Sequence, residues 1–529
     1  MHCKNQKIKN ALISVYDKTN ILMLAQELFK KNTTIFTTNS TEQFLKKNKI
    51  ITKNVSTITQ YPEILDGQIK TLHPKIFGGI LGQHKKNIAT TIKYNIPIID
   101  LVIINFYPCN TLYNINNDIK PNIDIGGPAM VRAAAKNYKH TIVIVDIEDY
   151  KYFLNEIRNT GYISIKTRLK LAKKAFEYTT NYDLSIVKYL KNKISISINK
   201  ENDLPEEIYI KYIKKQNLKY GENPHQKSAL YIQDQKNDMD YIHSMQQING
   251  ETLSYNNIYD AHIAFECVNQ FSNPTCVIIK HGSPCGASSA KNLISAYINA
   301  YNSDSISAFG GIIGFNKLID KDIISTIIKK QFVELIIGPE ITTEAIQIIT
   351  KYKKIKLLIF GNYNKKNVSK IEFKTINHSL LVQEKNDQIE NFNKWRIVST
   401  KKPTEIEKKY AIFCWKIAKF VKSNAIIYTN QFNTISIGAG QTNRLEAVKI
   451  ANLKYFQNKK IINKNDKNII MASDAFFPFR DSIDECKNKN KNISCIIQPG
   501  GSIRDAEVIQ AANEHEICMI FTDQRIFKH

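Results

Sequence analysis

The chain has 529 residues, 43% of them hydrophobic, which is enough for more than one domain core. Its formal net charge is +26. The excess is spread through Lys/Asn/Ile-rich stretches such as 459–465, without the signature of a recognition module, so nucleic-acid binding is disfavoured as the primary role. No apolar run approaches the ~20 residues of a membrane span and the N-terminal stretch has no apolar signal core, so we expect a cytoplasmic protein without membrane contacts.

The cysteines give no indication of a metal site. All nine are scattered, without a C-x-x-C pair, and we expect reduced thiols. Pro284-Cys285 invites comparison with zinc deaminases, whose signature combines H-x-E with P-C-x-x-C. Position 288 is Ser and the chain contains no H-x-E. We therefore predict no metal.

Over the first ~150 residues, short β-branched runs alternate with amphipathic stretches, which predicts an α/β fold. The expected strands cover 11–15, 34–37, 98–105 and 142–145. One helix is expected over 19–31, a second is expected to open with the capping box Ser40-x-x-Gln43, and a third begins near Gly126 with Pro128 at its first position.

The domain boundary is placed where this pattern breaks. Between Lys191 and Asn217 the chain becomes polar with mixed charges. We therefore predict a first domain at 1–197, a linker at 198–218 and a second, also mixed α/β, domain at 219–529. No repeat with a fixed period of roughly 20–50 residues is visible, which argues against a solenoid.

One candidate anion site lies in the first domain. Segment 124–136 places two glycines at a predicted helix start, where free backbone N–H groups and the helix dipole favour an anion. Arg132 and Lys136 are four residues apart and share a helix face, and Asp124 stands before them. Taken alone, the segment is better explained as a capped surface helix with a solvated basic stripe.

A second candidate is the pair Lys280 and His281. An apolar run at 275–279 precedes the pair, and a Gly/Ser/Pro loop follows it. Polar residues at the end of a strand are where active sites of open α/β sheets lie, although a buried histidine bonded to a backbone carbonyl explains His281 alone equally well. Adjacent strand residues point to opposite faces, so both side chains reach one pocket only if the backbone turns at Gly282.

In their joint order, these and further segments resemble the bifunctional AICAR transformylase/IMP cyclohydrolase family. The segments that carry the likeness are 61–75, 105–108, 124–137, 220–225, 276–286, 304–311, 422–425, 438–444, 473–481, 498–505 and 521–529. They cover nearly the whole chain. The resemblance implies an N-terminal methylglyoxal-synthase-like doubly wound domain, followed by a transformylase region of cytidine-deaminase-like α/β subdomains.

The resemblance also implies two reactions and a homodimer. A formyl group passes from 10-formyltetrahydrofolate, a cosubstrate, to the 5-amine of AICAR, and formyl-AICAR then closes to IMP with loss of water. No tightly bound cofactor is implied. The amine is a weak nucleophile, so a histidine base with a cation and an amide donor suits the transfer. Ring closure is intramolecular, so positioning and acid–base help suffice.

Matching positions assign residues to these reactions. For formyl transfer the catalytic residues implied are Lys280, His281 and Asn424, and for ring closure they are Lys70, Tyr107, Asp124 and Lys136. The substrate-binding residues implied are Tyr16, Asp17, Lys18, Thr38, Thr41, Thr71, Asn105, Ile125, Gly126, Lys219, Tyr220, Gly311 and Arg444. The folate-binding residues implied are Asn257, Phe476, Asp481, Gly500, Gly501 and Arg525.

Departures from the family pattern are concentrated in the first domain. Asn39 and Ser40 stand where the family has two glycines in a phosphate-contacting loop, Gln68 replaces Arg, and Tyr16 replaces Ser. In the second domain Lys219 replaces Arg, which keeps the charge but loses bidentate geometry. We therefore expect ring closure to be impaired more than formyl transfer.

Three hypotheses stay open from the sequence. The first is an enzyme with both activities. The second is a transformylase whose first domain is kept as structure. The third is a basic protein that binds nucleic acid or nucleotides and whose catalytic sites have decayed; joint retention of the formyl-transfer residues disfavours it.

Overall fold

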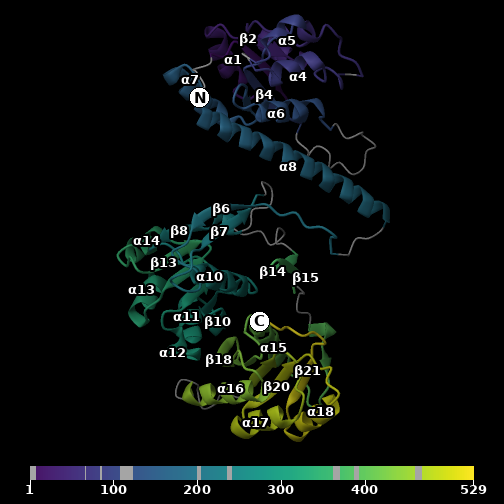
Figure 1. Ribbon diagram of the computed structural model, residues 1–529. Helices are drawn as coiled ribbons and strands as arrows, with labels where there is room; N and C mark the ends of the chain where they lie inside the picture. The colour runs from purple at the N-terminus through teal and green to yellow at the C-terminus, as the bar shows by residue number, and fades with distance from the viewer. Residues whose placement is uncertain are drawn as a thin grey trace. The chain divides into compact units, whose positions relative to one another are not determined.

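The computed structural model describes residues 7–65, 67–83, 86–107, 123–198, 204–234, 241–361, 370–386, 392–458 and 468–529, with the side chains of 192–198 excepted. The chain forms two compact units, Met1–Leu204 and Pro205–His529, whose elements are labelled in Figure 1. Several residues used in the sequence argument lie outside the described ranges: Cys3, Asp66, Pro108, Cys109 and 459–465. Within the described ranges, no helix is long and apolar enough to cross a membrane.

Unit 1 contains a five-stranded parallel sheet in the order β3-β2-β1-β4-β5. Its strands are β1 (Asn10–Val15), β2 (Thr34–Thr37), β3 (Lys53–Asn54), β4 (Leu101–Asn105) and β5 (Ile142–Ile144). The direction of winding reverses between β1 and β4. In doubly wound sheets, ligands bind outside the carboxyl ends of the strands at such a point. The predicted doubly wound α/β domain is thus confirmed, and the topology indicates where its site lies.

Helices cover both faces of this sheet. They are α1 (Ile21–Lys30), α2 (Asn39–Lys47), α3 (Ser56–Thr59), α4 (Pro74–Leu81), α5 (Ile88–Lys93), α6 (Gly126–Lys136), α7 (Glu148–Thr160) and α8 (Ile165–Ile198). Ile13 and Ile103 pack on the face covered by α1 and α7. Leu12 and Val102 pack on the other face, with α4, α6 and α8. Burial on both faces explains why these strands read as continuous apolar runs.

Two predicted helix starts differ from the structure. Helix α2 begins at Asn39 without a side-chain cap, so the capping box predicted from Ser40 and Gln43 is wrong. The hydroxyl of Thr38, the residue before the helix, lies 3.0 Å from the Ser14 hydroxyl instead. Helix α6 begins at Gly126, which makes Pro128 its third residue. The first turn tolerates proline there because its N–H would have no intrahelical partner.

Unit 2 is built around a twelve-stranded sheet in the order β16-β21-β20-β19-β17-β18-β10-β9-β11-β12-β13-β8. The strands are β8 (Gln246–Asn249), β9 (Thr275–Lys280), β10 (Ser283–Ser289), β11 (Ile312–Phe315), β12 (Leu335–Gly338), β13 (Lys356–Ile359), β16 (Arg396–Ile397), β17 (Ile426–Asn430), β18 (Asn433–Gly438), β19 (Ile469–Ser473), β20 (Ile493–Gln498) and β21 (Cys518–Phe521). Two similar six-stranded halves meet at the antiparallel pair β10 and β18. The prediction of α/β subdomains is confirmed.

The helices of the two halves also correspond. The first half contains α9 (Tyr241–Ser244), α10 (Tyr255–Val268), α11 (Leu293–Ser303), α12 (Ser305–Ala308), α13 (Lys321–Lys330) and α14 (Thr343–Ile349). The second contains α15 (Glu405–Ala418), α16 (Arg444–Asn458), α17 (Asp481–Lys489) and α18 (Asp505–Glu514). Both α10 and α15 open with a capping box, at Ser254 and Thr404, and each precedes a β-hairpin with a two-residue turn.

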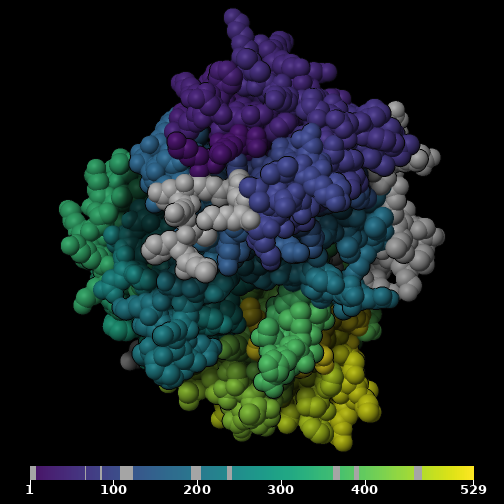
Figure 2. All heavy atoms as spheres, turned by 45° about the horizontal axis from the view of Figure 1, so that its top comes forward, coloured from purple at the N-terminus to yellow at the C-terminus, as the bar shows by residue number. Residues whose placement is uncertain are grey.

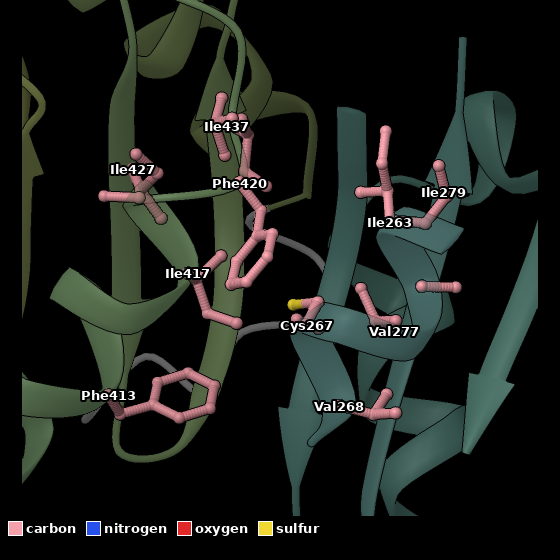
Figure 3. Packing of buried hydrophobic residues seen from close by; sticks show 14 of the residues in the cluster. Ile263, Cys267, Val268, Val277, Ile279, Phe413, Ile417, Phe420, Ile427 and Ile437 are labelled. Atoms are coloured by element: carbon pink, nitrogen blue, oxygen red, sulfur yellow. The ribbon is translucent and has the colours of Figure 1, made fainter. Parts of the chain in front are cut away.

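One hydrophobic core joins the halves of unit 2. Figure 3 shows Cys267 and Val268 of α10 facing Phe413 and Ile417 of α15 and the nearby Phe420. All five residues are buried. Because these helices pack in a single cluster on one face of the sheet, the hairpins that follow them are held in one frame. Side chains from both halves can therefore contribute to one site.

Two hairpins lie outside the large sheet. One pairs β6 (Tyr212–Asn217) with β7 (Ala229–Gln233), and the other pairs β14 (Ile371–Ile376) with β15 (Ser379–Glu384). Strand β6 falls inside the segment expected to be the linker, 198–218, which is thus partly regular. Residues 199–203 of that segment lie outside the described ranges.

Two candidate active sites

One edge of the large sheet gathers most of the residues predicted for formyl transfer. The strand pairings make β9, β18, β19, β20 and β21 run in the same direction, so their carboxyl ends meet at one edge, where β11 and β17 begin. At or shortly beyond these strand ends lie Lys280, His281, Gly311, Asn424, Arg444, Phe476, Asp481, Gly500, Gly501 and Arg525. Segments up to 245 positions apart in the sequence are thus brought to one edge of the sheet.

The turn after β9 changes the geometry expected for the adjacent residues Lys280 and His281, both predicted to be catalytic. The strand ends at Lys280, and His281 and Gly282 form the turn with φ angles of 52° and 76°. Since His281 belongs to the turn, strand alternation no longer forces it to the face opposite Lys280. The Lys280 ammonium donates to the carbonyls of Phe309 and Gly310 at 2.9 and 3.3 Å.

Asp260 of α10 holds this turn, and no motif in the sequence indicated it. Its Oδ1 accepts the N–H of Gly282 at 2.8 Å. Burial raises the pKa of Asp260, while the Gly282 N–H and the charges of His281 and Lys422 act to lower it. The side chains of Tyr259 and Lys422 pack so closely that a Cβ on Gly282 would lie 2.9 Å from the Tyr259 ring. Glycine is therefore required at the second position of the turn.

Asn424 is fixed by a buried ionic network. The Arg444 guanidinium donates to Asn424 Oδ1 at 2.7 Å and to the Ala425 carbonyl at 3.2 Å, and it pairs with the Asp474 carboxylate. Asn424 Nδ2 donates to the Gln441 carbonyl at 2.8 Å. Arg444 and Asp474 are 6% and 0% exposed. Arg444, predicted to contact substrate, is thus engaged in holding Asn424, while its role toward substrate stays a prediction.

The end of the chain closes a hollow beside Asn424. The hollow measures about 430 Å³ and is lined by Ser423, Asn424, Gly440, Gln441, Thr442, Phe527 and His529. The backbone N–H of Ser423 donates to the Lys528 carbonyl at 2.9 Å, and the Lys528 N–H donates to the Ser423 hydroxyl at 3.1 Å. These bonds fix the C-terminal segment as one wall of the hollow.

The residues predicted to bind folate form an open surface around the last strands. Phe476 is 40% exposed, and Gly501, with φ 95°, has open space where a side chain would lie. A Cβ on Gly500 would lie 2.3 Å from the Phe521 ring, so only glycine fits. The Arg525 guanidinium stands 4.4 Å from the centre of the Phe527 ring. An aromatic face and a cation in an open loop region can hold a flat ring and an anion.

Asp481, also predicted to bind folate, opens α17. Its Oδ1 accepts the Ser482 backbone N–H at 2.6 Å. The carboxylate therefore has one oxygen engaged at the helix start, beside the same loop region as Phe476.

Asn257, predicted to bind folate, has its side chain engaged within the protein, and its role toward folate stays a prediction. It is buried in the capping box of α10, where its side chain accepts from the Ser254 N–H at 3.1 Å and donates to Glu334 at 2.7 Å. Glu334 also faces the Lys356 ammonium at 3.6 Å. Both polar atoms of the Asn257 amide are thus engaged inside the protein. Glu334, which the sequence did not indicate, stands at the start of β12 on the site's edge of the sheet.

The remaining predicted substrate contacts of unit 2 lie near this edge. Lys219 pairs with Glu251 at 2.8 Å, and the Tyr220 carbonyl accepts from the Tyr255 N–H at the start of α10. Gly311 is tightly packed, since a Cβ there would lie 3.0 Å from the Ile278 side chain. A small residue is therefore needed between the loop and β9.

In unit 1, the predicted site lies at the switch point of the sheet. Tyr16, Asp17 and Lys18 follow β1, and Asn105 and Tyr107 end or follow β4. Asn105 Oδ1 accepts the N–H groups of Tyr16 and Asp17 at 2.6 and 2.9 Å, and its Nδ2 donates to the Asp17 carbonyl at 3.0 Å. The rings of Tyr16 and Tyr107 are 4.6 Å apart. Asn105 thus orders the loop that borders the crevice.

The start of α2 carries the residues that replace the family glycines. Thr38 and Thr41 are buried, and the Thr41 hydroxyl accepts the Val15 N–H at 3.2 Å. Asn39 and Ser40 are exposed in the first turn of the nine-residue helix, where backbone N–H groups attract anions. The Asn39 side chain accepts from Asn54 Nδ2 at 2.6 Å. Two side chains thus border the backbone N–H groups of this helix start, and its role in binding phosphate stays a prediction.

Four more predicted residues meet at the start of α6. Asp124 Oδ1 accepts the Gly127 N–H at 2.8 Å, and a Cβ on Gly126 would lie 2.7 Å from the hydroxyl of the buried Thr71. Burial raises the pKa of Asp124, while the Gly127 N–H and the charge of Lys70 act to lower it. The structure thus brings Lys70, Thr71, Asp124 and Gly126 together.

Lys136 is not brought to this group within one chain. Helix α6 joins the carboxyl end of β4 to the amino end of β5, so Lys136, its last residue, lies about 15 Å along the axis from Gly126. Ile125, just before the helix, is 62% exposed. The proton-transfer role of Lys136 stays a prediction.

Asp124→Asn is expected to stabilise unit 1 increasingly as the pH rises. Because the folded-state pKa of Asp124 is raised, the carboxyl's favourable contribution is present at low pH and is lost as the pH rises through that pKa. Asn keeps an oxygen for the Gly127 N–H but does not ionise. Thermal unfolding from pH 4 to 8 should show a growing advantage of the variant, with ring closure slowed at least about 100-fold. If the stability difference between the variant and the unmodified chain shrank as the pH rose, the pKa of Asp124 would not be raised in the folded protein.

Comparison with known proteins finds two matching families and several full-length relatives. A family described as "AICARFT/IMPCHase bienzyme" matches residues 134–454, and an "MGS-like domain" matches residues 20–128. The bifunctional purine biosynthesis protein PurH of Buchnera aphidicola subsp. Schizaphis graminum is 52% identical over 530 residues. Those of the subspecies Acyrthosiphon pisum (strain 5A) and Baizongia pistaciae are 50% and 46% identical. In each case 99% of both chains is covered.

A solved structure described as "Crystal structure of ForH" is 31% identical, covers 35% of this chain and 99% of its own, and has a TM-score of 0.31. The full-length relatives and the matching family confirm the resemblance seen in the sequence. The chain belongs to the AICARFT/IMPCHase bienzyme family of bifunctional purine biosynthesis proteins.

Proposed function

We propose that this chain carries out the last two steps of purine synthesis, with formyl transfer in unit 2 and ring closure in unit 1. The observation that carries the proposal is the edge of the large sheet, where residues from both halves gather around the Lys280–His281 turn. Family membership supports the pairing of the two reactions in one chain. The predicted domains, 1–197 and 219–529, are proposed as the two catalytic parts.

Formyl transfer needs a base, a cation and an amide donor, and the turn and the loop before β17 supply them. The 5-amine of AICAR attacks the formyl carbon of 10-formyltetrahydrofolate, forming a C–N bond. His281, exposed in its turn, takes the amine proton. Lys280 and Asn424 stabilise the tetrahedral oxyanion. The bond between the formyl carbon and N10 then breaks, and the proton passes from His281 to N10.

The formyl donor is a folate-type cosubstrate that binds and leaves, rather than a tightly bound cofactor. We propose that Phe476 stacks on its flat ring system, Gly500 and Gly501 let it approach the backbone, and Arg525 attracts its carboxylate. Asp481 is proposed to accept a hydrogen bond from the ring. The open loops after β19, β20 and β21 support this placement.

Ring closure is proposed at the switch point of unit 1. The carboxamide nitrogen of formyl-AICAR attacks the formyl carbon, and water leaves after proton transfer. Asp124, whose pKa burial raises, is proposed to accept and return the proton, with Lys70 beside it, and Tyr107 is proposed to contact the substrate from the loop after β4. The start of α2 binds the substrate phosphate. The order Asn105 imposes on the Tyr16–Asp17 loop supports this site.

An alternative function is formyl transfer alone, without ring closure, and the residues at the start of α2 are the reason to consider it. Asn39 and Ser40 border the anion site of α2 where the family has glycines. We propose that ring closure persists with weakened phosphate binding. In the full chain, supplied with formyl-AICAR, the change Asn39→Gly with Ser40→Gly should raise kcat/KM about tenfold through a lower KM. An unchanged or lower kcat/KM would show that these side chains do not obstruct phosphate.

We also propose a cytoplasmic homodimer. The β14–β15 hairpin exposes Ile376, Leu380 and Leu381, which are 48%, 42% and 56% exposed. Figure 2 shows this hairpin in green at the surface. Two strands alone are marginally stable in water, so a second copy packed on the hairpin would supply the missing burial. Sedimentation of the full chain should show a dimer, and a monomer at micromolar concentration would contradict this.

A further inference from the structure

The carboxylate of Asp260 is the anchor of the turn that carries His281. Its Oδ1 accepts the Gly282 N–H at 2.8 Å from the sixth residue of α10. The helix itself is held at its start by the capping box of Ser254 and Asn257. The anchor is therefore rigid, because it stands one turn after a fixed helix end.

The turn requires such an anchor. His281 and Gly282 both have left-handed backbone, with φ of 52° and 76°, a conformation that a residue with a Cβ adopts at a cost. The side chains of Tyr259 and Lys422 crowd Gly282, leaving no room for a Cβ. Gly282 thus has neighbours that limit its position and one hydrogen bond that fixes its N–H. That bond therefore holds the backbone directly after His281.

The second half of unit 2 shows an equivalent anchor of different chemistry. Its hairpin turn begins at Gln431, with φ 53°, and continues with Phe432. Phe432 packs against Tyr410, the sixth residue of α15, with ring centres 5.1 Å apart. Tyr410 and Asp260 therefore occupy equivalent helix positions, and Phe432 and Gly282 equivalent turn positions. In both halves the helix contacts the turn. Only in the first half, where Lys280 and His281 stand at the turn, is that contact made by a carboxylate.

We propose that Asp260 is a positioning residue for formyl transfer: its hydrogen bond to Gly282 sets the turn so that Lys280 and His281 face the same formyl carbon. This inference rests on the proposed transferase function of unit 2. Asp260 acts through the turn and does not touch the reacting atoms. Its carboxylate also lies within electrostatic reach of His281 and Lys422, but the position of its oxygen, rather than its charge, is what the turn needs.

Three substitutions in the full chain separate position from charge. Asp260→Ala removes the acceptor, and kcat for formyl transfer should fall about 10- to 100-fold with KM for AICAR within about threefold. Asp260→Asn keeps an oxygen in place without charge and should recover kcat to within about fivefold of the unmodified chain. Asp260→Glu keeps the charge but displaces the oxygen, so it should be slower than the Asn variant.

A matched control comes from Asp320, an aspartate of unit 2 that also accepts backbone N–H groups but lies outside the proposed site. Asp320 accepts the N–H groups of Asp322 and Ile323 at 3.0 and 2.9 Å at the start of α13. Asp320→Ala should lower the denaturant midpoint and leave formyl transfer unchanged. Denaturant unfolding of every variant shows whether it is folded under assay conditions.

The outcomes distinguish the proposals. An Ala variant with the kcat of the unmodified chain overturns the inference, as does a Glu variant faster than the Asn variant. If the Ala variant does not fold, the comparison of kcat between the Asn and Glu variants still tests the role of Asp260. If the unmodified chain transfers no formyl group to AICAR, the proposed function fails rather than the role of Asp260.

Discussion

Replacing His281 with Ala is expected to lower kcat for formyl transfer about 10²- to 10⁴-fold while ring closure of supplied formyl-AICAR stays unchanged. The imidazole is the proposed proton acceptor, and it stands at the first position of the turn after β9. The ring-closure residues lie in the other unit, so they do not depend on it. Steady-state kinetics of each reaction in the full chain measure both effects.

The matched control for this change is Gln431→Ala. Gln431 occupies the first position of the equivalent turn in the second half, with φ 53° against 52° for His281. Both substitutions replace a residue that already has a Cβ in left-handed backbone, so both should change stability only slightly and by similar amounts. Only the change at His281 should affect formyl transfer. Equal loss of the two reactions in the His281 variant would contradict separate sites.

Replacing Arg444 with Met is expected to have the largest effect on stability. It leaves the Asp474 carboxylate, which is 0% exposed, without its cation. Removing one partner of a buried ion pair costs about 3–5 kcal/mol. Asn424 also loses the guanidinium that holds its Oδ1, so formyl transfer should fall even where the protein stays folded. Denaturant unfolding of the full chain, followed through unit 2, measures the loss.

A second substitution tests the reason for that loss. Adding Asp474→Asn removes the uncompensated charge while keeping an acceptor for the Ala425 N–H, which Asp474 Oδ1 accepts at 3.1 Å. The double variant should recover at least about 1 kcal/mol relative to Arg444→Met. A single variant that loses less than about 1 kcal/mol would show that the pair adds little to folding.

The fold was predictable where local pattern and burial agree. The parallel strands of unit 1 read as apolar runs because both their faces are covered, and β1, β2, β4 and β5 fall close to the predicted ranges. The start of α2 was misplaced because the pattern Ser40-x-x-Gln43 imitates a cap, whereas the end of β2 already directs the chain into the helix. Strand β6 was missed because its residues are mostly polar and exposed.

The segments that form the candidate site of unit 2 could be predicted from the sequence, but the hydrogen bonds between them could not. Motif order brought Lys280, His281 and Asn424 together, and the strand pairings place them at one edge. The contacts of Asp260 and Glu334 could not be predicted, because each depends on pairing between distant segments. For Lys136 the opposite holds, because closeness in the sequence does not bring it close to Asp124 in the fold. It is near Asp124 in the motif, but a helix running away from the site separates them.

One chain is proposed both to formylate AICAR and to close the product to IMP. The most direct test mixes the full chain with AICAR and 10-formyltetrahydrofolate and follows the products by chromatography over time. We expect IMP to accumulate, with formyl-AICAR passing through a transient maximum because the proposed weakening of phosphate binding slows ring closure. Formyl-AICAR that persists without IMP would contradict the ring-closure activity. The absence of any formylated product would contradict the proposed formyl transfer and, with it, the synthesis of IMP from AICAR by this chain.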